Sequence, residues 1–274
     1  MVSSMSRIAQ QDYQLIIIEV VMIASVRGAV ALMRCFTVQE SELSVTELSQ
    51  RLATHKSTNS RLLATLCAEG LVDRNPATGK YHLGMGLLEL GGLVVWHADL
   101  RQIARPLLRQ LSVDTQETVN MAILDRNESL NTEQVVSHNR HISGFGWVGR
   151  KTPLHASSTG KVLLAYLPKG DRKMSLNLPL KQFTENTITD LKDLWEELEL
   201  VLSRGYATGL EELVVGLNAV AAPVRDTTGE VFAAVSVTGP SPRLSKQRII
   251  TEIAANAISC GSQIYQDLGY VVTS

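Results

Sequence analysis

Apolar residues recur at helical spacing through the first part of the chain, with short polar breaks between the repeats. This spacing predicts a helix over residues 26–37. Its apolar face is expected to consist of Val26, Val30, Met33 and Phe36. A second helix is predicted after Ser44, because Ser44 with Glu47 three residues later is the sequence pattern of a capping box. Leu48 and Leu52 then begin a buried stripe.

The third helix has an unusual amino end. The segment KSTNSRLLATLCAEGLV, residues 56–72, starts with a cation and small or polar groups and only then becomes regularly apolar. We expect the helix to end before Gly70, because glycine suits a left-handed helix cap. The sequence LVDRNPATGKYHLG, residues 71–84, predicts a hairpin. Residues 25–84 thus predict helix, helix, turn, helix and hairpin, the order of a winged helix-turn-helix.

After residue 117 the pattern changes to strand-like segments mixed with helical ones. The expected strands are TVNMAILD, NTEQVVSH, AVAAPVRD and VFAAVSVTG, and the expected helices are SSTGKVLLAYL, DLKDLWEELELVLSRG and SKQRIITEIAANAISCGSQIYQDLG. Because these do not alternate in strict β-α-β order, we expect an α+β domain with an antiparallel sheet. The expected organisation is an N-terminal extension at 1–24, a winged helix-turn-helix at 25–85, a linker helix at 86–103 and a second domain at 104–274.

The segment LIIIEVVMIA, Leu15 to Ala24, is apolar but does not predict a membrane span. It has ten residues and contains Glu19, whereas a span needs about 20 apolar residues. A signal peptide is not indicated either, because Arg7 is the only cation before the segment and no small-residue cleavage site follows it. We expect an extra helix or strand that packs on the body or on a second subunit. The alternative is that translation begins at Met22.

Composition limits the classes of function. Apolar residues make up 45% of the 274 residues, which indicates a folded protein, and the formal net charge of −1 means that any nucleic-acid footprint must be local. Residues 48–85 carry five Lys or Arg side chains and two Asp or Glu side chains. The cysteines, Cys35, Cys67 and Cys260, are far apart and odd in number, which fits reduced, buried thiols in a cytoplasmic protein.

The amino end of the third helix has the composition of a DNA-reading surface. In a helix-turn-helix the second helix of the motif points its first residues into the major groove. Small polar side chains, free backbone N–H groups and an arginine such as Arg61 can contact phosphates or base edges there. An ordinary solvated face is the alternative. The predicted DNA-contacting residues are Thr46, Lys56, Ser57, Thr58, Asn59, Ser60, Arg61 and, beside the hairpin turn, Arg74 and Lys80.

Several separated motifs occur together in the order of a known family. They are SVRGAVALM (25–33), LSVTELSQRLATHKSTNSRLLATLCAEGLVDRNPATGKYHLG (43–84), LHASSTGKVLLAYLP (154–168) and RGYATGLEELVVGLNAVAAPVRDTTGEVFAAVSVTGPSPRLS (204–245), followed by a closing helix. With them the chain resembles the isocitrate lyase regulator (IclR) family of bacterial transcription factors. The resemblance implies a winged helix-turn-helix, a linker helix, a C-terminal effector-binding domain similar to GAF and PAS domains, and homodimers or homotetramers on palindromic double-stranded operator DNA.

The resemblance also implies a pocket for a small effector in the second domain. The stretch SSTGK precedes an apolar helix, so its N–H groups lie at a positive helix end that can hold a carboxylate. A plain helix cap is the alternative. The implied pocket residues are Phe145, Trp147, Ser158, Thr159, Gly160, Gly209, Glu212, Ala219, Ser236 and Thr238.

The sequence departs from one pattern within that family. Some relatives that bind small keto acids carry an acidic residue and a cysteine where Gly209 and Ala219 stand in this chain. The exchange leaves more room and less polarity, and Phe145 and Trp147 add aromatic surface. We therefore expect a larger carboxylate, with aromatic acids among the candidates.

Three other patterns favour structure over chemistry. The G-x-G-x-x-G match at residues 144–149 is followed by a proline-containing segment and not by a helix. The stretch SSTGK lacks both the first glycine and the final Ser or Thr of a P-loop. The histidines His138, His141 and His155 have no acidic or cysteine cluster with which to build a metal site. We expect no catalytic site, metal or cofactor.

Together these patterns predict a ligand-responsive, DNA-binding transcriptional regulator that controls a catabolic operon in the cytoplasm. A carboxylate would favour one conformation of the second domain, and the linker helix would alter the geometry of two DNA-binding domains. Such coupling is worth about 1–3 kcal/mol. The sequence leaves open whether the effect is repression or activation. An enzyme or an adaptor built on a GAF-like domain is the alternative.

Overall fold

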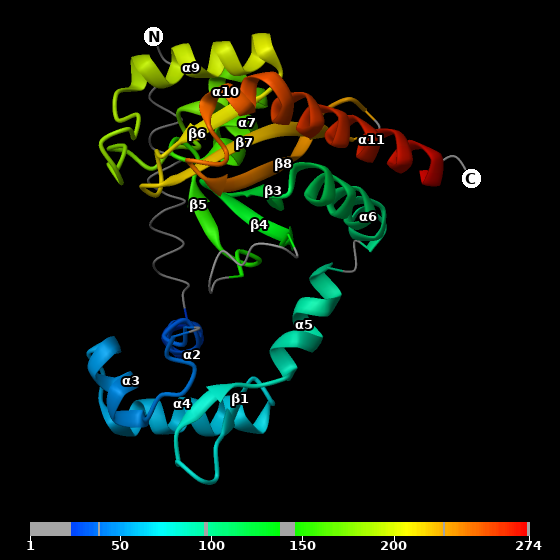
Figure 1. The fold of residues 1–274 in the computed structure, drawn as a ribbon. Helices are drawn as coiled ribbons and strands as arrows, with labels where there is room; N and C mark the ends of the chain where they lie inside the picture. Colours follow the sequence, from blue (N-terminus) through cyan, green and yellow to red (C-terminus); the bar gives the residue numbers. More distant parts are fainter. Residues whose placement is uncertain (1–22, 38, 96–97, 138–145, 227, 273–274) are drawn as a thin grey trace, which may run out of the picture. The chain divides into compact units, whose positions relative to one another are not determined.

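The computed structural model describes residues 23–37, 39–95, 98–137, 146–226 and 228–272 (Figure 1). The chain divides into two compact units, Met1–Trp96 and His97–Ser274. The apolar segment Leu15 to Ala24 lies almost wholly outside the described residues. Among the described residues, none of the helices combines the length and the apolar character needed to cross a bilayer.

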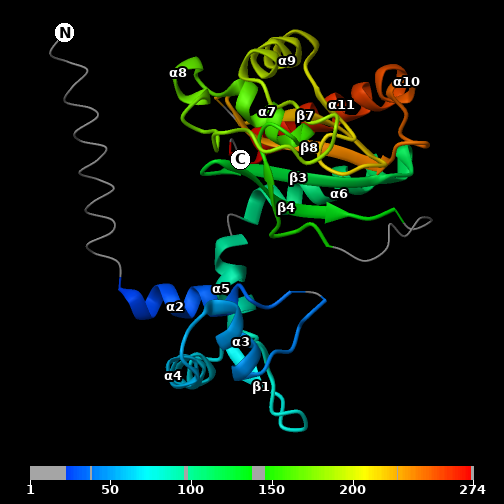
Figure 2. The ribbon, with the colours of Figure 1, turned by 90° about the vertical axis from the view of Figure 1, so that its left-hand side faces the viewer.

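The first unit is the expected winged helix-turn-helix (Figure 2). Its capping box is present: the Ser44 amide donates to Glu47 Oε2 at 2.7 Å, and the Glu47 amide donates to Ser44 Oγ at 3.2 Å. Gly70 has a φ of +66° and ends the third helix, as expected. The elements are α2 (Ala24–Met33), α3 (Val45–Leu52), α4 (Lys56–Ala68), β1 (Val72–Arg74), β2 (Tyr81–Leu83) and α5 (Gly86–Val95).

The expectation for α2 was wrong in its length and held for only half of its apolar face: Met33 and Phe36 pack against the core of this unit, but Val26 and Val30 do not. The helix ends at Met33 instead of reaching residue 37. Val26 and Val30 are exposed, whereas Leu32 is fully buried in a core with Leu48 and Leu63. The reason is the rotation of α2 about its own axis. The helix face that contains Leu32 packs toward α4, so the face that contains Val26 and Val30 points away from this core.

The second unit is the expected α+β domain with an antiparallel sheet. Its six strands run in the order β5-β4-β3-β8-β7-β6, and each neighbouring pair is antiparallel. The short strands β5 and β6 were not expected. The strands are β3 (Thr118–Asp125), β4 (Glu128–Val135), β5 (Lys151–Pro153), β6 (Ala207–Leu210), β7 (Leu217–Arg225) and β8 (Val231–Pro240).

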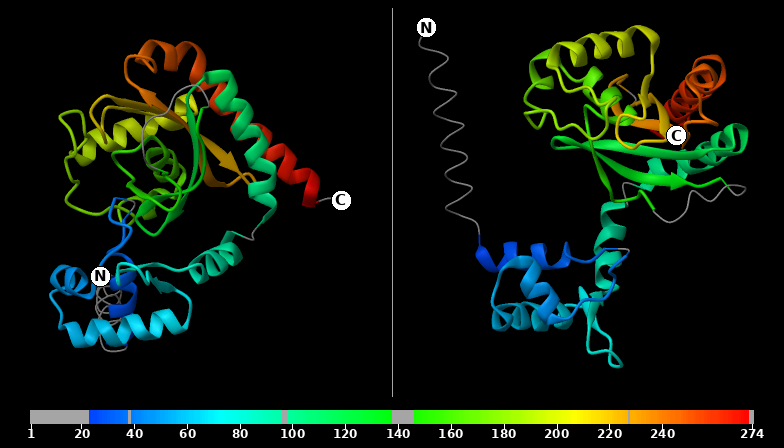
Figure 3. Two further views of the ribbon diagram at one scale, coloured as in Figure 1. Left: turned by 60° about the horizontal axis from the view of Figure 1, so that its bottom comes forward. Right: turned by 60° about the vertical axis from the view of Figure 1, so that its left-hand side comes forward.

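Helices cover both faces of this sheet. On one face α6 and α11 lie side by side (Figure 3), and on the other face α7 and α9 pack together. Strand β8 shows how one strand serves both: Val235 and Val237 belong to the core under α6 and α11, and Ser236 between them faces the α7 side. The helices are α6 (Ala98–Thr115), α7 (Ser158–Tyr166), α8 (Lys169–Arg172), α9 (Leu191–Arg204), α10 (Lys246–Arg248), the π-helical turn η1 (Ile249–Ile253) and α11 (Ala254–Val272).

The cysteines are free thiols with different surroundings. Cys260 is buried, and this burial raises the pKa of its thiol to about 12. Cys35 and Cys67 are half-buried, so the expectation of burial holds fully only for Cys260. Desolvation also raises the pKa of both of these thiols.

Candidate DNA-binding and effector-binding sites

The amino end of α4 exposes most of the polar side chains that were predicted to contact DNA. Lys56, Ser57, Thr58, Ser60 and Arg61 are all exposed. His55 precedes the helix as its N-cap residue, and its side chain makes no capping hydrogen bond. The first turn of α4 contains no acidic side chain. The positive end of the helix dipole therefore reaches solvent without local compensation.

Two cations of this surface have no acidic partner. The side chains of Lys56 and Arg61 make no ion pair with any described residue. Thr46, in the first turn of α3, is also exposed. A concave surface of about 730 Å³ runs between α2 and α4 and includes Arg61 and, from α2, Arg27. Sequence reasoning missed Arg27, because only the tertiary packing of α2 against α4 brings it beside the third helix.

Asn59 is a correction to the predicted DNA-contacting set. Its side chain is 1% exposed, and its Nδ2 donates to Ser49 Oγ at 3.0 Å and to Thr54 Oγ1 at 2.8 Å. These bonds join α4 to the end of α3 and to the turn between them. The residue faces inward because it lies four positions before Leu63 and seven before Leu66, on the buried row of the helix. The Asn59 side chain therefore joins α4 to α3 and to the turn between them and is not part of the exposed surface of α4.

The two cations of the hairpin are less available than the cations of α4. Lys80 Nζ lies 3.3 Å from Glu47 Oε1, and the capping hydrogen bonds from Ser44 hold the pKa of Glu47 at about 2. Arg74 Nε donates to the Gly79 carbonyl at 3.2 Å, and its guanidinium group stacks 5.7 Å from the ring centroid of Tyr81. Both side chains remain near the hairpin tip, but each would have to exchange a protein contact for a phosphate.

In the second unit, most of the predicted effector residues line one small cavity of about 60 Å³. Trp147, Ser158, Thr159, Gly209, Ala219, Ser236 and Thr238 all belong to its lining. None of the residues that line it carries a charged side chain. A cavity of this size holds only a few non-hydrogen atoms, because one water needs about 10–15 Å³ on this measure.

The floor of this cavity is the amino end of α7. Ser157 caps the helix, because its Oγ accepts from the Gly160 amide at 3.2 Å. The amides of Ser158 and Thr159 donate to no described residue. Gly209 lies over them: a Cβ at this position would be 3.4 Å from the Ser158 nitrogen. The absence of a side chain at Gly209 keeps two N–H groups and a positive helix end open toward the cavity.

Two predicted effector residues, Gly160 and Glu212, do not line the cavity, and a third lies outside the described residues. Gly160 does not line the cavity; a Cβ there would lie 2.5 Å from Leu154 Cα, so this glycine allows the chain to turn tightly before α7. Glu212 is buried and turned toward Lys161, away from the cavity. Phe145 lies outside the described residues.

Two asparagines complete the lining and were missed from the sequence. Asn120 in β3 and Asn131 in β4 are both buried and both line the cavity. Asn120 stands opposite Ser236 in the sheet, and its Nδ2 lies 3.5 Å from Thr238 Oγ1. A signal existed: Asn120 is a polar residue between two apolar neighbours in β3, and it lies on the same face of the sheet as the hydroxyls of β8.

A buried ion pair adjoins the cavity. Lys161 is 1% exposed, and its Nζ donates to Glu212 Oε1 at 2.7 Å and to Glu212 Oε2 at 2.9 Å. Glu197 lies 3.7 Å from the same Nζ. Burial raises the pKa of Glu212, while the lysine charge opposes the shift. The pair joins α7 to the β6–β7 loop, whose residues Leu213 and Val214 line the cavity.

The histidines singled out in the sequence do not build a metal site among the described residues. Among them, no three His, Cys, Asp or Glu side chains come together in a way that could hold a metal ion. His155 is buried, its Nε2 lies 2.9 Å from the Lys181 carbonyl oxygen, and burial lowers its pKa. His138 and His141 lie outside the described residues.

Residues 92–266 match the family description "Bacterial transcriptional regulator IclR C-terminal", and residues 25–76 match the "IclR helix-turn-helix domain". The chain belongs to the IclR family of transcriptional regulators. The transcriptional regulator BhcR of Paracoccus denitrificans is 38% identical over 210 residues, which are 76% of this chain and 75% of that protein. The transcriptional repressor AllR of Escherichia coli is 35% identical over 210 residues, 76% of this chain and 77% of that protein.

Solved structures of the IclR family share the fold. An IclR homolog from Microbacterium hydrocarbonoxydans, solved in complex with 4-hydroxybenzoate, has a TM-score of 0.77 at 27% identity, over 89% of this chain and 99% of that one. The winged helix-turn-helix and the α+β effector domain are thus both family features, which agrees with the architecture described above.

Replacing Asn59 by alanine is expected to lower the free energy of unfolding by about 1–3 kcal/mol, because it removes two buried hydrogen bonds and leaves the Thr54 and Ser49 hydroxyls without their donor. Chemical denaturation followed by circular dichroism measures the change. The exposed neighbour Ser60 is the control, and Ser60→Ala should stay within about 0.5 kcal/mol of the wild type. Equal stability of the two variants would contradict the structural role of Asn59.

Removing Lys161 should make stability depend on pH. Lys161→Met leaves Glu212 buried without its counter-ion, and we expect a loss of about 3–5 kcal/mol at neutral pH. The pKa of Glu212 would rise further in the folded state. An acid with a raised folded pKa stabilises the fold below its unfolded pKa, and this contribution is lost as pH rises through the folded pKa. The variant should therefore become more stable from about pH 8 to about pH 5.

The double variant Lys161→Met/Glu212→Leu is the control for this measurement. It lacks the buried carboxyl group, so it should recover part of the lost stability and should not show the gain at low pH. Urea denaturation at both pH values gives the comparison. An identical pH dependence of the single and double variants would show that Glu212 is not the titrating group.

Proposed function

We propose that this IclR-family regulator binds operator DNA through the amino end of α4. The observation that carries the proposal is that this helix end exposes hydroxyls, a lysine and an arginine without an acidic partner among the described residues, while Asn59 anchors it from inside. Arg61 is the proposed bidentate contact to guanine or phosphate. Ser57, Thr58 and Ser60 would contact phosphates or base edges, with Lys56 and Arg27 on the backbone.

The remaining predicted contacts have smaller proposed roles. Thr46 on α3 is exposed and would reach the phosphate backbone beside the recognition helix. Arg74 and Lys80 would contact the backbone or the minor groove from the hairpin, after releasing their present partners. These contacts position the domain on the duplex and carry little sequence information.

We propose that the effector is a small carboxylate held at the amino end of α7. Its supports are the two free amides of Ser158 and Thr159, the open space at Gly209, and hydroxyls from Ser236 and Thr238 in the same lining. An anion in a cavity without charged side chains is stabilised by the helix end and by neutral donors. Gly160 supports the site indirectly, by allowing the turn that brings α7 to it.

The effector that we propose is larger than a keto acid, with aromatic acids as the first candidates. The small residues Gly209 and Ala219 and the ring of Trp147 favour such a ligand, and a family member has been solved with 4-hydroxybenzoate. The present cavity of about 60 Å³ is too small for an aromatic ring. Binding would therefore require the β6–β7 loop, in which Val214 is exposed, to move outward. That movement would be the link between binding and the change in DNA affinity.

The complete proposal is a cytoplasmic, ligand-responsive regulator of a catabolic operon that performs no chemistry. Residues 25–85 would bind DNA, residues 86–103 would link, and residues 104–274 would bind the effector. Homodimers or homotetramers fit this mode of action, because two helix-turn-helix domains related by a two-fold axis read a palindromic operator.

Arg61→Ala should weaken binding to the DNA upstream of the protein's own gene by about 1–3 kcal/mol if the side chain reads a base. A gel-shift titration measures the affinity. Lys173→Ala is the matched control, because Lys173 is an exposed cation in the second unit and its removal should leave the affinity unchanged. Unchanged binding by Arg61→Ala would remove Arg61 from the proposed contacts.

Gly209→Asp should abolish binding of benzoate, because its side chain occupies the open space above the free amides of α7 that a carboxylate larger than a keto acid needs. Calorimetric titration with benzoate and with pyruvate measures binding to wild type and variant. Gly170→Asp adds the same charge at an open, exposed position and should bind like the wild type. Tight binding of pyruvate without binding of benzoate would contradict the proposed size of the effector.

A further inference from the structure

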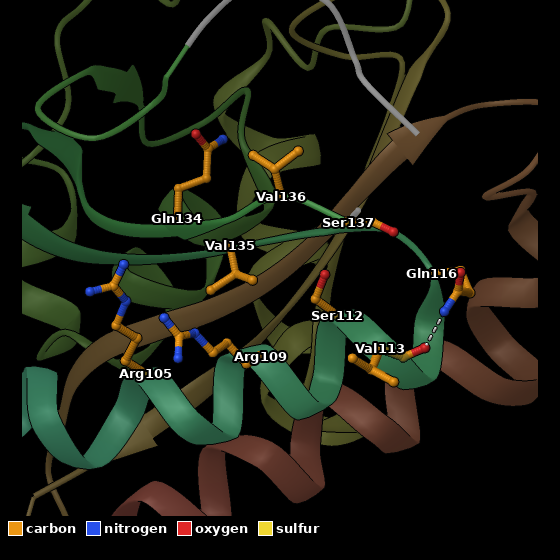
Figure 4. A pocket seen from close by; sticks show the side chains of 9 residues that line it. All are labelled: Arg105, Arg109, Ser112, Val113, Gln116, Gln134, Val135, Val136 and Ser137. Atoms are coloured by element: carbon orange, nitrogen blue, oxygen red, sulfur yellow. Dashed lines mark hydrogen bonds between the residues drawn. The ribbon is translucent and has the colours of Figure 1, made fainter. Parts of the chain in front are cut away.

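A second and much larger cavity, of about 690 Å³, lies in the effector domain between α6 and the end of β4 (Figure 4). It shares Gln134 with the hydrogen-bond network of the effector cavity but is lined by different residues. Its lining includes Arg105, Arg109, Ser112, Gln134, Val136 and Ser137. Its volume falls within the range of about 300–1,000 Å³ that is usual for sites of small organic ligands.

Two arginines form one wall of this cavity. Arg105 and Arg109 are four residues apart on α6, and both side chains rise from the helix toward β4 (Figure 4). Neither makes an ion pair with any described residue. Like charges at this spacing repel each other on a helix. The arrangement is therefore one that an anion between the two guanidinium groups would stabilise.

The acidic residues nearby in sequence do not supply this anion. Asp114, on the same helix, accepts a hydrogen bond from Gln110 and does not line the cavity. Glu133, on β4, is buried and also does not line the cavity. The positive charge of the arginine wall is thus not neutralised by these neighbours.

The rest of the lining indicates the chemistry of the occupant. Ser112 and Ser137 are buried at the cavity, and the Ser112 hydroxyl already donates to the Glu117 carbonyl at 2.8 Å. Val136 is exposed and offers apolar surface beside them. Guanidinium groups bind carboxylates and phosphates in forked pairs. Two of them beside apolar and hydroxyl surface suit a molecule with two anionic groups on a short carbon body.

We propose that this cavity binds a small organic dianion, with one anionic group on Arg105 and the other on Arg109. The site is separate from the effector cavity at α7, so binding there does not depend on the proposed function. The cavity volume favours a dicarboxylate or a phosphorylated organic acid over inorganic phosphate, which would leave most of the cavity unfilled and would not contact its apolar surface.

Gln134 connects this site to the effector cavity. Its Nε2 donates to Asn120 Oδ1 at 3.1 Å, and its Oε1 accepts from the Trp147 amide at 3.2 Å. Both partners line the effector cavity. A dianion that touches Gln134 would therefore alter the surroundings of Trp147. The hydrogen bonds of Gln134 belong to the structure itself. Only the inference that they carry a regulatory signal rests on the proposed function.

Calorimetric titration with succinate tests the site. The wild type should bind succinate, and Arg105→Gln/Arg109→Gln should bind it at least about tenfold more weakly, since each lost charge-assisted contact accounts for about that factor. The control is Lys173→Gln/Lys246→Gln, which removes two exposed cations elsewhere in the same unit and should bind like the wild type. Inorganic phosphate should bind more weakly than succinate.

Three results would overturn the proposal. They are an arginine variant that binds succinate like the wild type, a lysine control that loses as much affinity, and phosphate binding as tight as that of succinate. Operator and benzoate binding by the arginine variant are measured in parallel. They should be preserved, so failure of this site is distinguishable from failure of the proposed function.

Tryptophan emission tests the link through Gln134. Succinate should change the emission of the wild type, and the change should be absent in Trp147→Phe and reduced in Gln134→Met, which lacks both hydrogen bonds. An equal change in Trp147→Phe would place the signal at another tryptophan and would rule out this link.

Discussion

The buried ion pair between Lys161 and Glu212 holds the two walls of the effector cavity together. One wall is the amino end of α7, and the other is the β6–β7 loop. The backbone of this loop is also held by Thr187, whose Oγ1 donates to the Glu212 carbonyl at 2.6 Å. Breaking such a pair leaves an unpaired charge in the interior, which is why both partners must stay. The shape of the effector cavity therefore depends on an interaction that is not part of its lining.

Local signals account for what could be predicted from the sequence. The capping box at Ser44, the left-handed cap at Gly70 and the alternating residues of β3 and β8 each depend on neighbours in the chain, and all appear in the structure. The error at Asn59 arose from tertiary contacts. Asn59 was assigned to DNA because its neighbours in the sequence are polar, but the packing of α3 against α4 turns it inward. Strands β5 and β6 were missed because segments of three and four residues carry little periodicity.

The two proposed sites both use the positive amino end of a helix, but this end is exposed in α4 and buried in α7. Each places the positive amino end of a helix against an anion, and in each the first turn carries small polar residues. In α4 the end is exposed and adds charged side chains, which suits a long polyanion in water. In α7 the end is covered by β6 and β8, which suits one small anion withdrawn from water. Burial, more than residue type, separates the two functions.

This difference in setting has a consequence for ionic strength. Attraction between exposed lysines and arginines and duplex phosphates falls steeply as salt rises, because binding releases condensed counterions. The lining of the α7 cavity has no charged side chain and most of its residues are buried, so mobile ions screen it far less. Raising the salt concentration would thus uncouple the two activities, by removing the protein from its operator while leaving it able to hold its effector.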